Sequence, residues 1–439
     1  MTFITSIIGG CAVTSGREDA LWREYRELAP ARERAEPAQL FAPDKPLDRA
    51  ALVGAVIERN PSVAAAREGL RAALAEIPQA TAFEDPSVSY EMAPLSITGD
   101  RFGQTISVRQ PLPFPGKRRL AGDAALARAE VQGAELGSVR LELAETASAL
   151  YDDYYVVARS LEINAHHREL LEDMKKSAQA QYVAGKAAQQ DPIQAEVELA
   201  RLARERLALE ADGDQIVARI NGLLHRAPSA ALPPAPTELE LSATPAGTSA
   251  ELQELALRKR PQREAARARI EAARADIEVA RRAYYPDLAV MGSYSSMWDM
   301  PEHRWMVGLM VDVPIFRGKR DAAVEQARAE AARAGFEDER LADEIRVEVD
   351  RAHRRVAEAE ALVKLHEKEL VPAARAQVDA ARAGFTSGQT SFVAVVEAHK
   401  NMREAELELE LARAELSRRR AALSRAVGLV PGLPEGGSR

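Results

Sequence analysis

Two halves of this sequence match each other motif by motif, at a nearly constant offset. The matching pairs are Asn60-Pro61 with Arg260-Pro261, Phe114-Pro115-Gly116-Lys117-Arg118 with Phe316-Arg317-Gly318-Lys319-Arg320, and Tyr182-Val183-Ala184-Gly185 with Phe385-Thr386-Ser387-Gly388. Because the matches keep the same order with little drift, the chain is a tandem duplication. Each half is therefore expected to fold into the same succession of elements.

Proline-rich segments separate these halves from each other and from the chain ends. The stretch 227–247 is rich in proline and has the composition of a linker. We expect a signal or lipoprotein leader at 1–10 that is shorter than usual, an N-terminal extended segment at 11–50, a first repeat at 51–226, a Pro-rich linker at 227–247, a second repeat at 248–429 and a disordered tail at 430–439. Each repeat reads as helix, two strands, long helix and helix.

Each half contains one very long helical stretch. No proline occurs from Lys117 to Ala184, and apolar residues recur there in steps of three and four, which indicates a helix with one stripe facing a partner. Such a helix would be roughly 100 Å long at 1.5 Å per residue. The counterpart, Lys319 to Ala383, contains Pro372 and is predicted to kink or break there. An antiparallel coiled-coil scaffold would show the same periodicity.

Two short alternating stretches lie between the helices of each half. Their apolar residues are Val88, Tyr90 and Met92, then Ile106 and Val108, then Leu288, Val290 and Tyr294, and finally Trp305, Val307, Leu309, Val311 and Val313. Each has about the 9–11 residues with which a tilted strand crosses a bilayer. Four strands cannot close in lipid, so two chains would supply eight strands or three would supply twelve. Hairpins packed on the helices of a soluble protein are the alternative.

Composition excludes several classes of function. The 59 Lys and Arg alternate with 67 Asp and Glu, for a net charge of −8, which argues against nucleic-acid binding. Apolar runs are too short for a transmembrane helix. Gly116-Lys117 lacks the upstream glycine and the following Ser or Thr of a phosphate loop, and His366-Glu367 lacks the second histidine of a zinc-protease helix. We therefore predict no enzyme and no cofactor.

The single cysteine lies near the start of the chain. Cys11 follows Ile8-Gly9-Gly10 and a short apolar stretch, a pattern similar to a lipobox, so Cys11 is predicted to be lipidated. An ordinary cysteine in a frayed N-terminus is the alternative.

Two groups of residues could be read as metal ligands. His166 and His167 are adjacent on a helix and diverge by about 100°, which favours exposure over chelation. Soft ligands cluster in the second hairpin at Met297, Met300, His303 and Met306, and they could meet Cu(I) or Ag(I). Because such a cluster is more often a rim loop, it is only a weak candidate and no metal site is assigned.

From residue 52 to 429 the chain resembles the TolC-like outer-membrane efflux factors. The marks are Asn60-Pro61, Gln110-Pro111-Leu112 before Gly116-Lys117-Arg118, Tyr285-Pro286-Asp287-Leu288, Val313-Pro314-Ile315-Phe316 before Gly318, and Phe385-x-x-Gly388. The resemblance implies a mainly α fold with a small β part. Long α-helical hairpins would form a periplasmic tunnel, and four strands per chain would join a trimeric twelve-stranded transmembrane barrel.

The same resemblance implies a function. The chain would be the outer-membrane channel of a tripartite efflux system in a Gram-negative bacterium. It would form a homotrimer and dock to a periplasmic adaptor and an inner-membrane pump. It would export metal cations or small toxic compounds passively, and Phe114-Pro115-Gly116-Lys117-Arg118-Arg119 resembles the branch that serves heavy-metal pumps of the resistance-nodulation-division class. A periplasmic coiled-coil adaptor or scaffold without a pore is the alternative.

The resemblance also implies residues that control flow. Tyr182, Gly185, Phe385 and Gly388 form the tip turns. Two acids follow the tip glycine in the family pattern, and here Ala394 and Glu397 stand at those positions, with Asp191 comparable in the first repeat. Glu397 and Asp191 are thus predicted at the pore entrance, where a carboxylate ring favours cations. Alternatively, Glu397 is a solvated helix acid and Asp191 a helix N-cap before Pro192.

Overall fold

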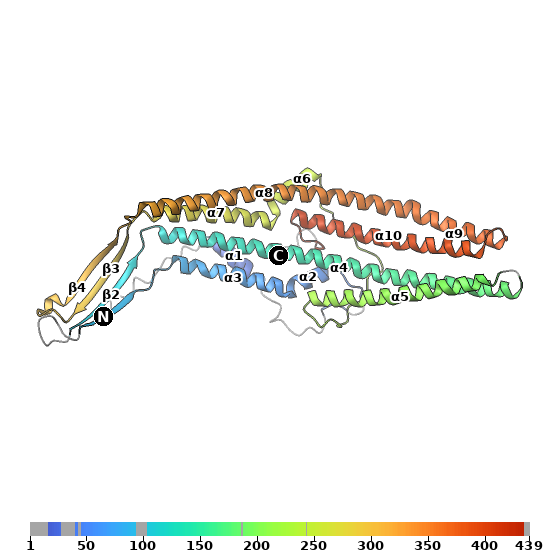
Figure 1. The fold of residues 1–439 in the computed structure, drawn as a ribbon, viewed down its shortest axis with the longest axis horizontal. Coiled ribbons are helices and arrows are strands. Elements are labelled where there is room, and N and C mark those ends of the chain that lie inside the picture. The colour runs from blue at the N-terminus through green and yellow to red at the C-terminus, as the bar shows by residue number, and fades with distance from the viewer. Residues whose placement is uncertain are drawn as a thin grey trace. The chain divides into compact units, whose positions relative to one another are not determined.

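The structure, a computed structural model, describes residues 16–27, 40–42, 45–93, 103–185, 188–242 and 244–433. These residues are mainly helical and include a four-stranded sheet (Figure 1). The chain divides into two compact units: unit 1 takes in 1–28, 66–136 and 262–341, and unit 2 takes in 29–65, 137–261 and 342–439. Each unit combines segments of both repeats. This division describes how segments pack in space. It does not test the repeat boundaries, which stay a prediction from the sequence.

Unit 1 combines the sheet with helical segments from both halves. It contains α1 (Gly16–Glu27), most of α3 (Pro61–Thr81), β1 (Ser87–Ala93), β2 (Gly103–Leu112), the start of α4 (Lys117–Val183), most of α7 (Pro261–Arg282), β3 (Asp287–Ser295), the 3-10 turn η2 (Pro301–His303), β4 (Trp305–Asp312) and the start of α8 (Arg317–Leu365). The helix α1 corrects the prediction that 11–50 is extended. Arg17 of α1 pairs with Glu130 and with Glu271, which attaches this polar helix to α4 and α7.

The four strands form one antiparallel sheet in the order β1-β2-β3-β4. Its register aligns residues of like character across the strands, since Tyr90 lies opposite Ile106, Ile106 opposite Tyr294, and Tyr294 opposite Trp305. The neighbouring row on the other face carries Ser89, Ser107, Ser293 and Met306. The predicted alternation is confirmed: one face of the sheet is apolar, and the other is polar in β1 and β2 and mixed in β3 and β4.

The repeated Gly-Lys-Arg motif ties each long helix to the helix before it. Nε of Arg118 donates to the carbonyl of Thr81 at 2.7 Å, and Nε of Arg320 donates to the carbonyl of Ala283 at 2.8 Å. These bonds satisfy carbonyls that the ends of α3 and α7 leave without helical partners. The same contact therefore recurs in both halves, as a duplication requires.

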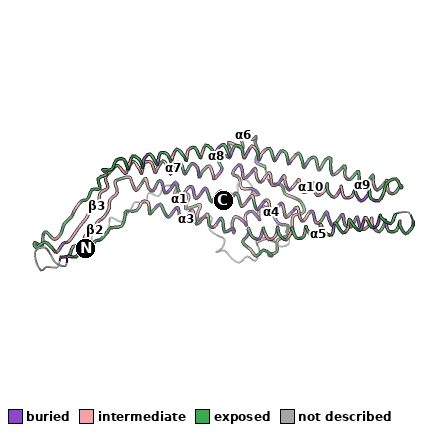
Figure 2. The backbone as a smooth tube through the Cα atoms, in the orientation of Figure 1, coloured by how far each residue is buried: buried purple, intermediate pink, exposed green. Residues whose placement is uncertain are grey.

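Unit 2 is built from helices and the linker. It contains α2 (Arg49–Arg59), the rest of α4, α5 (Gln190–Leu223), α6 (Ser249–Lys259), the rest of α8, the π-helical turn η3 (His366–Leu370), α9 (Val371–Thr386) and α10 (Phe392–Val427). Leucines, valines and alanines from α2, α4 and α5 make its largest apolar cluster, with Leu52, Leu150 and Ile220 almost fully buried. Figure 2 shows long exposed stretches along α8, whereas buried residues recur along α4.

The long helices behave as their sequences predict. The helix α4 runs unbroken for 67 residues. Its counterpart is interrupted by η3, and Pro372 lies at the start of α9. Proline lacks the N–H that a continuous helix would need, and a π turn absorbs the mismatch. In the described part of the chain, no helix has both the length and the apolar character that crossing a membrane requires.

The start of the predicted disordered tail is ordered. Val430 and Leu433 pack against the apolar cluster of unit 2, and Gly432 takes a positive φ of 78° between them. This corrects the prediction for 430–433. Cys11, the leader at 1–10 and residues 434–439 lie outside the described residues, so lipidation of Cys11 stays a prediction.

Candidate functional site

The two helical tips of unit 2 end in equivalent turns. The N–H of Gly185 donates to the carbonyl of Tyr182 at 2.9 Å, and the N–H of Gly388 donates to the carbonyl of Phe385 at 3.1 Å. Both glycines have positive φ, 69° and 74°, which is costly for residues with a Cβ. The ring of Phe385 also packs on Phe392, with centroids 5.7 Å apart. The structure thus places the four tip residues at matching positions in two turns.

The two predicted entrance acids have different surroundings. The Glu397 side chain is 59% exposed on α10, and Lys400 lies 3.6 Å away on the same helix. Asp191 is buried in the first turn of α5, whose N-cap is Gln189. The alternative that Asp191 caps the helix is therefore wrong. Of the two carboxylates, Glu397 is the one accessible to ions in the single chain.

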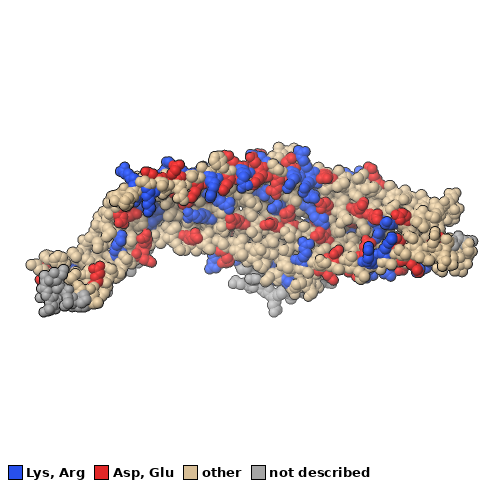
Figure 3. Space-filling model, viewed as in Figure 1, with Lys and Arg blue, Asp and Glu red and all other residues tan. Residues whose placement is uncertain are grey.

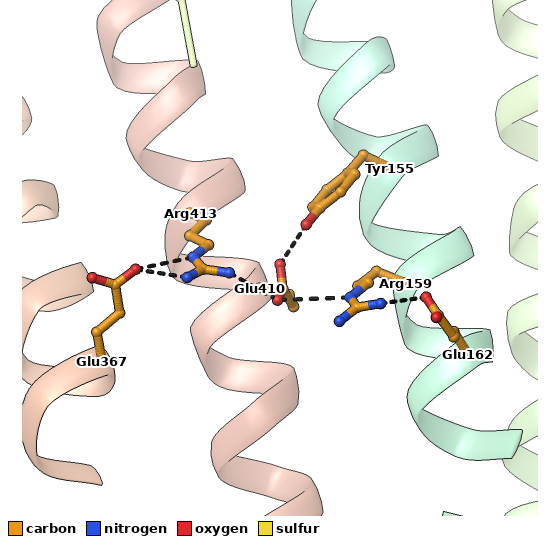
Figure 4. Close-up of polar contacts among 6 residues, drawn as sticks. All are labelled: Tyr155, Arg159, Glu162, Glu367, Glu410 and Arg413. Carbon is orange, nitrogen blue, oxygen red and sulfur yellow. Dashed lines mark hydrogen bonds and ion pairs between the residues drawn. The ribbon is translucent and has the colours of Figure 1, made fainter. Parts of the chain in front are cut away.

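A buried carboxylate joins α4 to α10 in the same unit (Figure 4). Glu410 is 5% exposed and accepts a hydrogen bond from the hydroxyl of Tyr155 at 2.6 Å. Nη1 of Arg413 donates to Glu410 at 3.1 Å, and Nε of Arg159 lies 3.8 Å from it. Arg413 also donates to Glu367 of η3 at 2.7 Å. The network therefore connects three helical segments.

Electrostatics explains why this carboxylate can be buried. Two guanidinium groups offset its charge, and its lone pairs accept hydrogen bonds. Burial raises the pKa of Tyr155 far above that of a free phenol, and the hydrogen bond to Glu410 raises it further. The phenol therefore stays a donor at neutral pH. Sequence reasoning missed this network, because no local pattern distinguishes Glu410 from the solvated acids of a long charged helix.

A second buried ion pair holds the linker against α4. Arg49 is 3% exposed, and its Nη2 donates to Asp152 at 2.7 Å and to the carbonyl of Glu240 at 2.8 Å. Its guanidinium also lies 4.3 Å from the ring centre of Tyr151. Burial raises the pKa of Asp152, and Arg49 opposes that shift. This contact fixes where the proline-rich linker crosses the helix.

Only one of the two adjacent histidines is exposed. His166 faces solvent, but His167 is 6% exposed, which corrects the expectation of exposure. Nε2 of His167 lies 2.8 Å from Glu406, a hydrogen bond that lowers the pKa of this carboxyl. His399 of α10 lies across from His167, and burial, with nearby Arg382, lowers its pKa to about 4.

The soft ligands of the second hairpin lie at its turn. Met297 and Met300 are exposed between β3 and β4, and the ring of His303 contacts Trp298. Met306 lies in β4 on the face opposite Trp305. No group of three His, Cys, Asp or Glu side chains that could hold a metal occurs among the described residues. The cluster stays a weak candidate.

The sheet exposes the apolar face that the sequence predicts. Trp305, Val307 and Leu309 of β4 are 73%, 87% and 65% exposed, and Val88 of β1 is 68% exposed. Figure 3 shows acidic and basic side chains interspersed over the helices, and mostly uncharged atoms over the strands. A strand surface this apolar and this exposed indicates an apolar environment or partner.

Comparison with known families agrees with this architecture. Residues 52–224 and 252–429 match the Outer membrane efflux protein family. Because the match covers most of both halves, the chain belongs to this family. It is therefore an outer-membrane efflux channel protein, and the family consists of channels. No curated protein sequence matches this chain.

Solved structures show the same fold. A crystal structure of CusC, described for its transmembrane channel formation, is 17% identical, with 90% of this chain and 98% of that chain covered and a TM-score of 0.75. VceC from Vibrio cholerae is 18% identical, with 86% and 95% covered and a TM-score of 0.72. The open-state MtrE channel of Neisseria gonorrhoeae is 18% identical, with 87% and 89% covered and a TM-score of 0.70. These likenesses confirm the predicted fold class.

Proposed function

We propose that three copies of this chain assemble into the passive export duct of a tripartite efflux system. The duct spans the outer membrane and receives its cargo from a periplasmic adaptor and an inner-membrane pump. The chain itself catalyses no reaction and carries no cofactor. Energy for transport therefore comes from the pump.

One observation carries this proposal: the sheet has an apolar face and two unpaired edges. Strands β1 and β4 each pair on one side only within the described chain. An edge strand in lipid leaves backbone N–H and C=O groups unsatisfied, which costs several kcal/mol per group. Pairing β4 of one copy with β1 of the next removes these edges. Three sheets then close a cylinder of twelve strands, with aromatic and aliphatic rows toward lipid.

The serine-rich face of the sheet supports the same arrangement. The hydroxyls of Ser89 and Ser107 lie 2.6 Å apart, and Thr105 donates to Ser295 at 2.9 Å. Polar side chains on this face suit a water-filled interior, whereas a packed soluble sheet would bury apolar residues there. A periplasmic adaptor or scaffold, the alternative function, has no use for such a sheet, and the family match favours the channel.

We propose further that Glu397 lines the periplasmic entrance. Its exposure beside the second tip turn, and its match to the second acid of the tip pattern, support this role. Three symmetry copies of one carboxylate, about 6 Å apart, repel one another by a few kcal/mol at an effective dielectric near 20. Cations would relieve that repulsion, so the entrance favours them and can be bridged by a divalent ion. The cargo class is metal cations or small toxic compounds, with a heavy-metal pump as the partner that the Gly-Lys-Arg region suggests.

Single-channel recording in planar bilayers tests the duct and its entrance together. The purified protein should give discrete, cation-selective steps that Mg²⁺ reduces. Glu397→Ala should lower the cation selectivity and weaken the block by Mg²⁺. Glu254→Ala removes an exposed carboxylate from α6 and should change neither property.

Two results would count against these assignments. Absence of any conductance from folded protein would contradict the duct. Normal conductance with the same selectivity and Mg²⁺ block in Glu397→Ala would leave the duct intact and remove Glu397 from its entrance.

A further inference from the structure

Opposite charges lie at the two edges of the sheet, at the end where its strands join the helices. Glu84 and Asp85 come shortly before β1, whereas Arg317 and Lys319 follow β4 at the start of α8. All four side chains are exposed, and none of them forms an ion pair within the described residues. An acidic edge and a basic edge are complementary, so a second copy of this chain is a partner that fits both.

Prolines mark equivalent positions of the two hairpins. Pro86 comes directly before β1 and Pro286 directly before β3, a shift of 200 positions. Pro111 lies in β2 and Pro314 follows β4, a shift of 203 positions. The hairpins agree with these shifts, because each pair between β1 and β2 moves by them onto a pair between β3 and β4. The two hairpins therefore correspond residue by residue.

The pairing in the middle of the sheet then predicts a pairing between copies. Strands β2 and β3 join the first half of the sheet to the second, and β4 with β1 of the next copy would repeat that joint. Gln110 of β2 lies opposite Val290 of β3. The same shifts place Val313 opposite Tyr90 of the next copy.

This register keeps the apolar face continuous across the joint. Val313 continues the exposed apolar row of β4, and Tyr90 belongs to that of β1. The next pair on this face is Val311 with Met92 of the next copy, and both are exposed in the single chain. A slip by one residue would move the whole row of β4 to the other face of the sheet.

The other face meets two acids in this register. Asp312 lies opposite Glu91 of the next copy, which is unfavourable for like charges. Arg109 lies 3.6 Å from Asp312, so its guanidinium offsets one of the two charges. The remaining carboxylate lies on the face that the proposed duct keeps in water.

The start of each long helix gives the contact at the helix end of the joint. Nζ of Lys117 lies 2.7 Å from Asp287 and 3.5 Å from the carbonyl oxygen of Tyr285. Between copies, Lys319 takes the place of Lys117, and Asp85 takes the place of Tyr285. The position equivalent to Asp287 is a serine. An acid two residues earlier therefore supplies the counter-charge that Asp287 supplies within the chain.

Strand direction decides which edges meet. With the helices of both copies at the same end of the sheet, β4 runs antiparallel to β1 of the next copy but parallel to another β4. Joining unlike edges is a head-to-tail contact, which can close into a ring. Antiparallel pairing of two β4 strands would instead place the helices of the two copies at opposite ends.

We propose that β4 pairs with β1 of the next copy with Val313 opposite Tyr90, and that ion pairs seal the helix end of this joint. In them, Lys319 and Arg317 of one copy bind Asp85 and Glu84 of the next. This joint presupposes the proposed duct, in which copies pair edge to edge. The register and the charges that select it are the new elements.

Disulfide cross-linking of the full chain in outer membranes tests the register, with copper-phenanthroline as the oxidant. Within one chain, positions 90 and 313 are three strand spacings apart, roughly 14 Å, which a disulfide cannot span. Val313→Cys combined with Tyr90→Cys should therefore join separate copies and give dimers and trimers on non-reducing gels. The parent, whose single cysteine is Cys11, and Val313→Cys alone should give neither.

Pairs shifted by two residues on the same face are matched controls. Val313→Cys with Val88→Cys, or with Met92→Cys, would hold the two Cα atoms about 7–8 Å apart and should cross-link at least about fivefold less. If a shifted pair cross-links better, or if no pair cross-links in protein that native mass spectrometry finds trimeric, the register is wrong and the duct stands. If the parent is a single chain in these membranes, the duct itself fails.

Charge reversal tests the ion pair separately. Lys319→Asp and Asp85→Lys should each lower the fraction of trimer in mild detergent by at least about twofold, because each brings like charges together at the joint. The two changes combined should restore the trimer of the parent. Single variants that assemble as the parent does, or a double variant that stays as weak as the single ones, would overturn this contact.

Discussion

Removing the hydroxyl of Tyr155 or the charge of Glu410 should loosen the contact between α4 and α10. A hydrogen bond to a charged group contributes about 1.5–3 kcal/mol, so Tyr155→Phe should cost an amount in that range. Glu410→Gln keeps an acceptor but leaves two guanidiniums short of a counter-charge. Because Arg159 and Arg413 are 35% and 37% exposed, each ion pair is discounted to about 1 kcal/mol or less. We expect about 2–4 kcal/mol for Glu410→Gln.

A double-mutant cycle isolates the bond itself. The variants Tyr155→Phe and Glu410→Gln should couple by about 1 kcal/mol, because Glu410→Gln replaces a charged acceptor by a neutral one and so weakens the bond that Tyr155→Phe removes. Hydrogen exchange followed by mass spectrometry, on peptides spanning 403–415 of α10, measures the opening free energy locally.

The neighbouring residue supplies a matched control. Tyr154→Phe also removes a hydroxyl, here a partly buried one that donates to the carbonyl of Pro233 at 3.0 Å and not to α10. Its exchange over 403–415 should equal that of the parent. If the effects of Tyr155→Phe and Glu410→Gln are strictly additive, with coupling below about 0.3 kcal/mol, the assigned hydrogen bond between α4 and α10 is refuted.

Three further predictions concern the titration of Tyr155, two glycines and the buried Arg49–Asp152 pair. The pKa of Tyr155 is higher in the folded chain than in the unfolded chain. Its protonated phenol therefore contributes stability that is present below pH 10 and is lost as the pH rises further, by about 1.4 kcal/mol per pH unit. In thermal melts at alkaline pH, Tyr155→Phe should lose stability less steeply with pH than the parent does. Gly388→Ala should lower the free energy of unfolding by about 1–2 kcal/mol, because Gly388 has a φ of 74°. Gly335→Ala, in open space on α8, should raise it by about 0.5–1 kcal/mol. Urea unfolding measures both changes. Arg49→Ala strands Asp152 without its counter-charge and should cost about 3–5 kcal/mol, while Arg49→Met combined with Asp152→Leu should cost much less in the same assay.

Local pattern was enough to predict the long helices and the strands. The helix α4 was predictable because its apolar residues keep a helical period without proline, and the break before α9 followed from Pro372. The strands were predictable because Tyr90, Ile106 and Trp305 belong to alternating stretches that the sheet then aligns. These signals depend only on near neighbours in the sequence.

Contacts between distant residues were beyond this kind of reasoning. Tyr155 and Glu410 are 255 positions apart, and an acid on a charged helix is usually solvated, so nothing local marked the pair. The helix α1 was missed because its few apolar residues give a weak pattern, whereas Arg17 secures it through acids on α4 and α7. His167 was predicted to be exposed because its partners on α10 are also distant in the sequence. Tertiary packing decides such cases.

The number of chains in the assembled particle tests the central claim most directly. Native mass spectrometry of the protein extracted from outer membranes in mild detergent measures it. The account predicts a particle of three times the 47.8 kDa of one chain, apart from bound lipid, because in the proposed duct three sheets close the barrel. A stable, folded single chain as the dominant species in those extracts would contradict it.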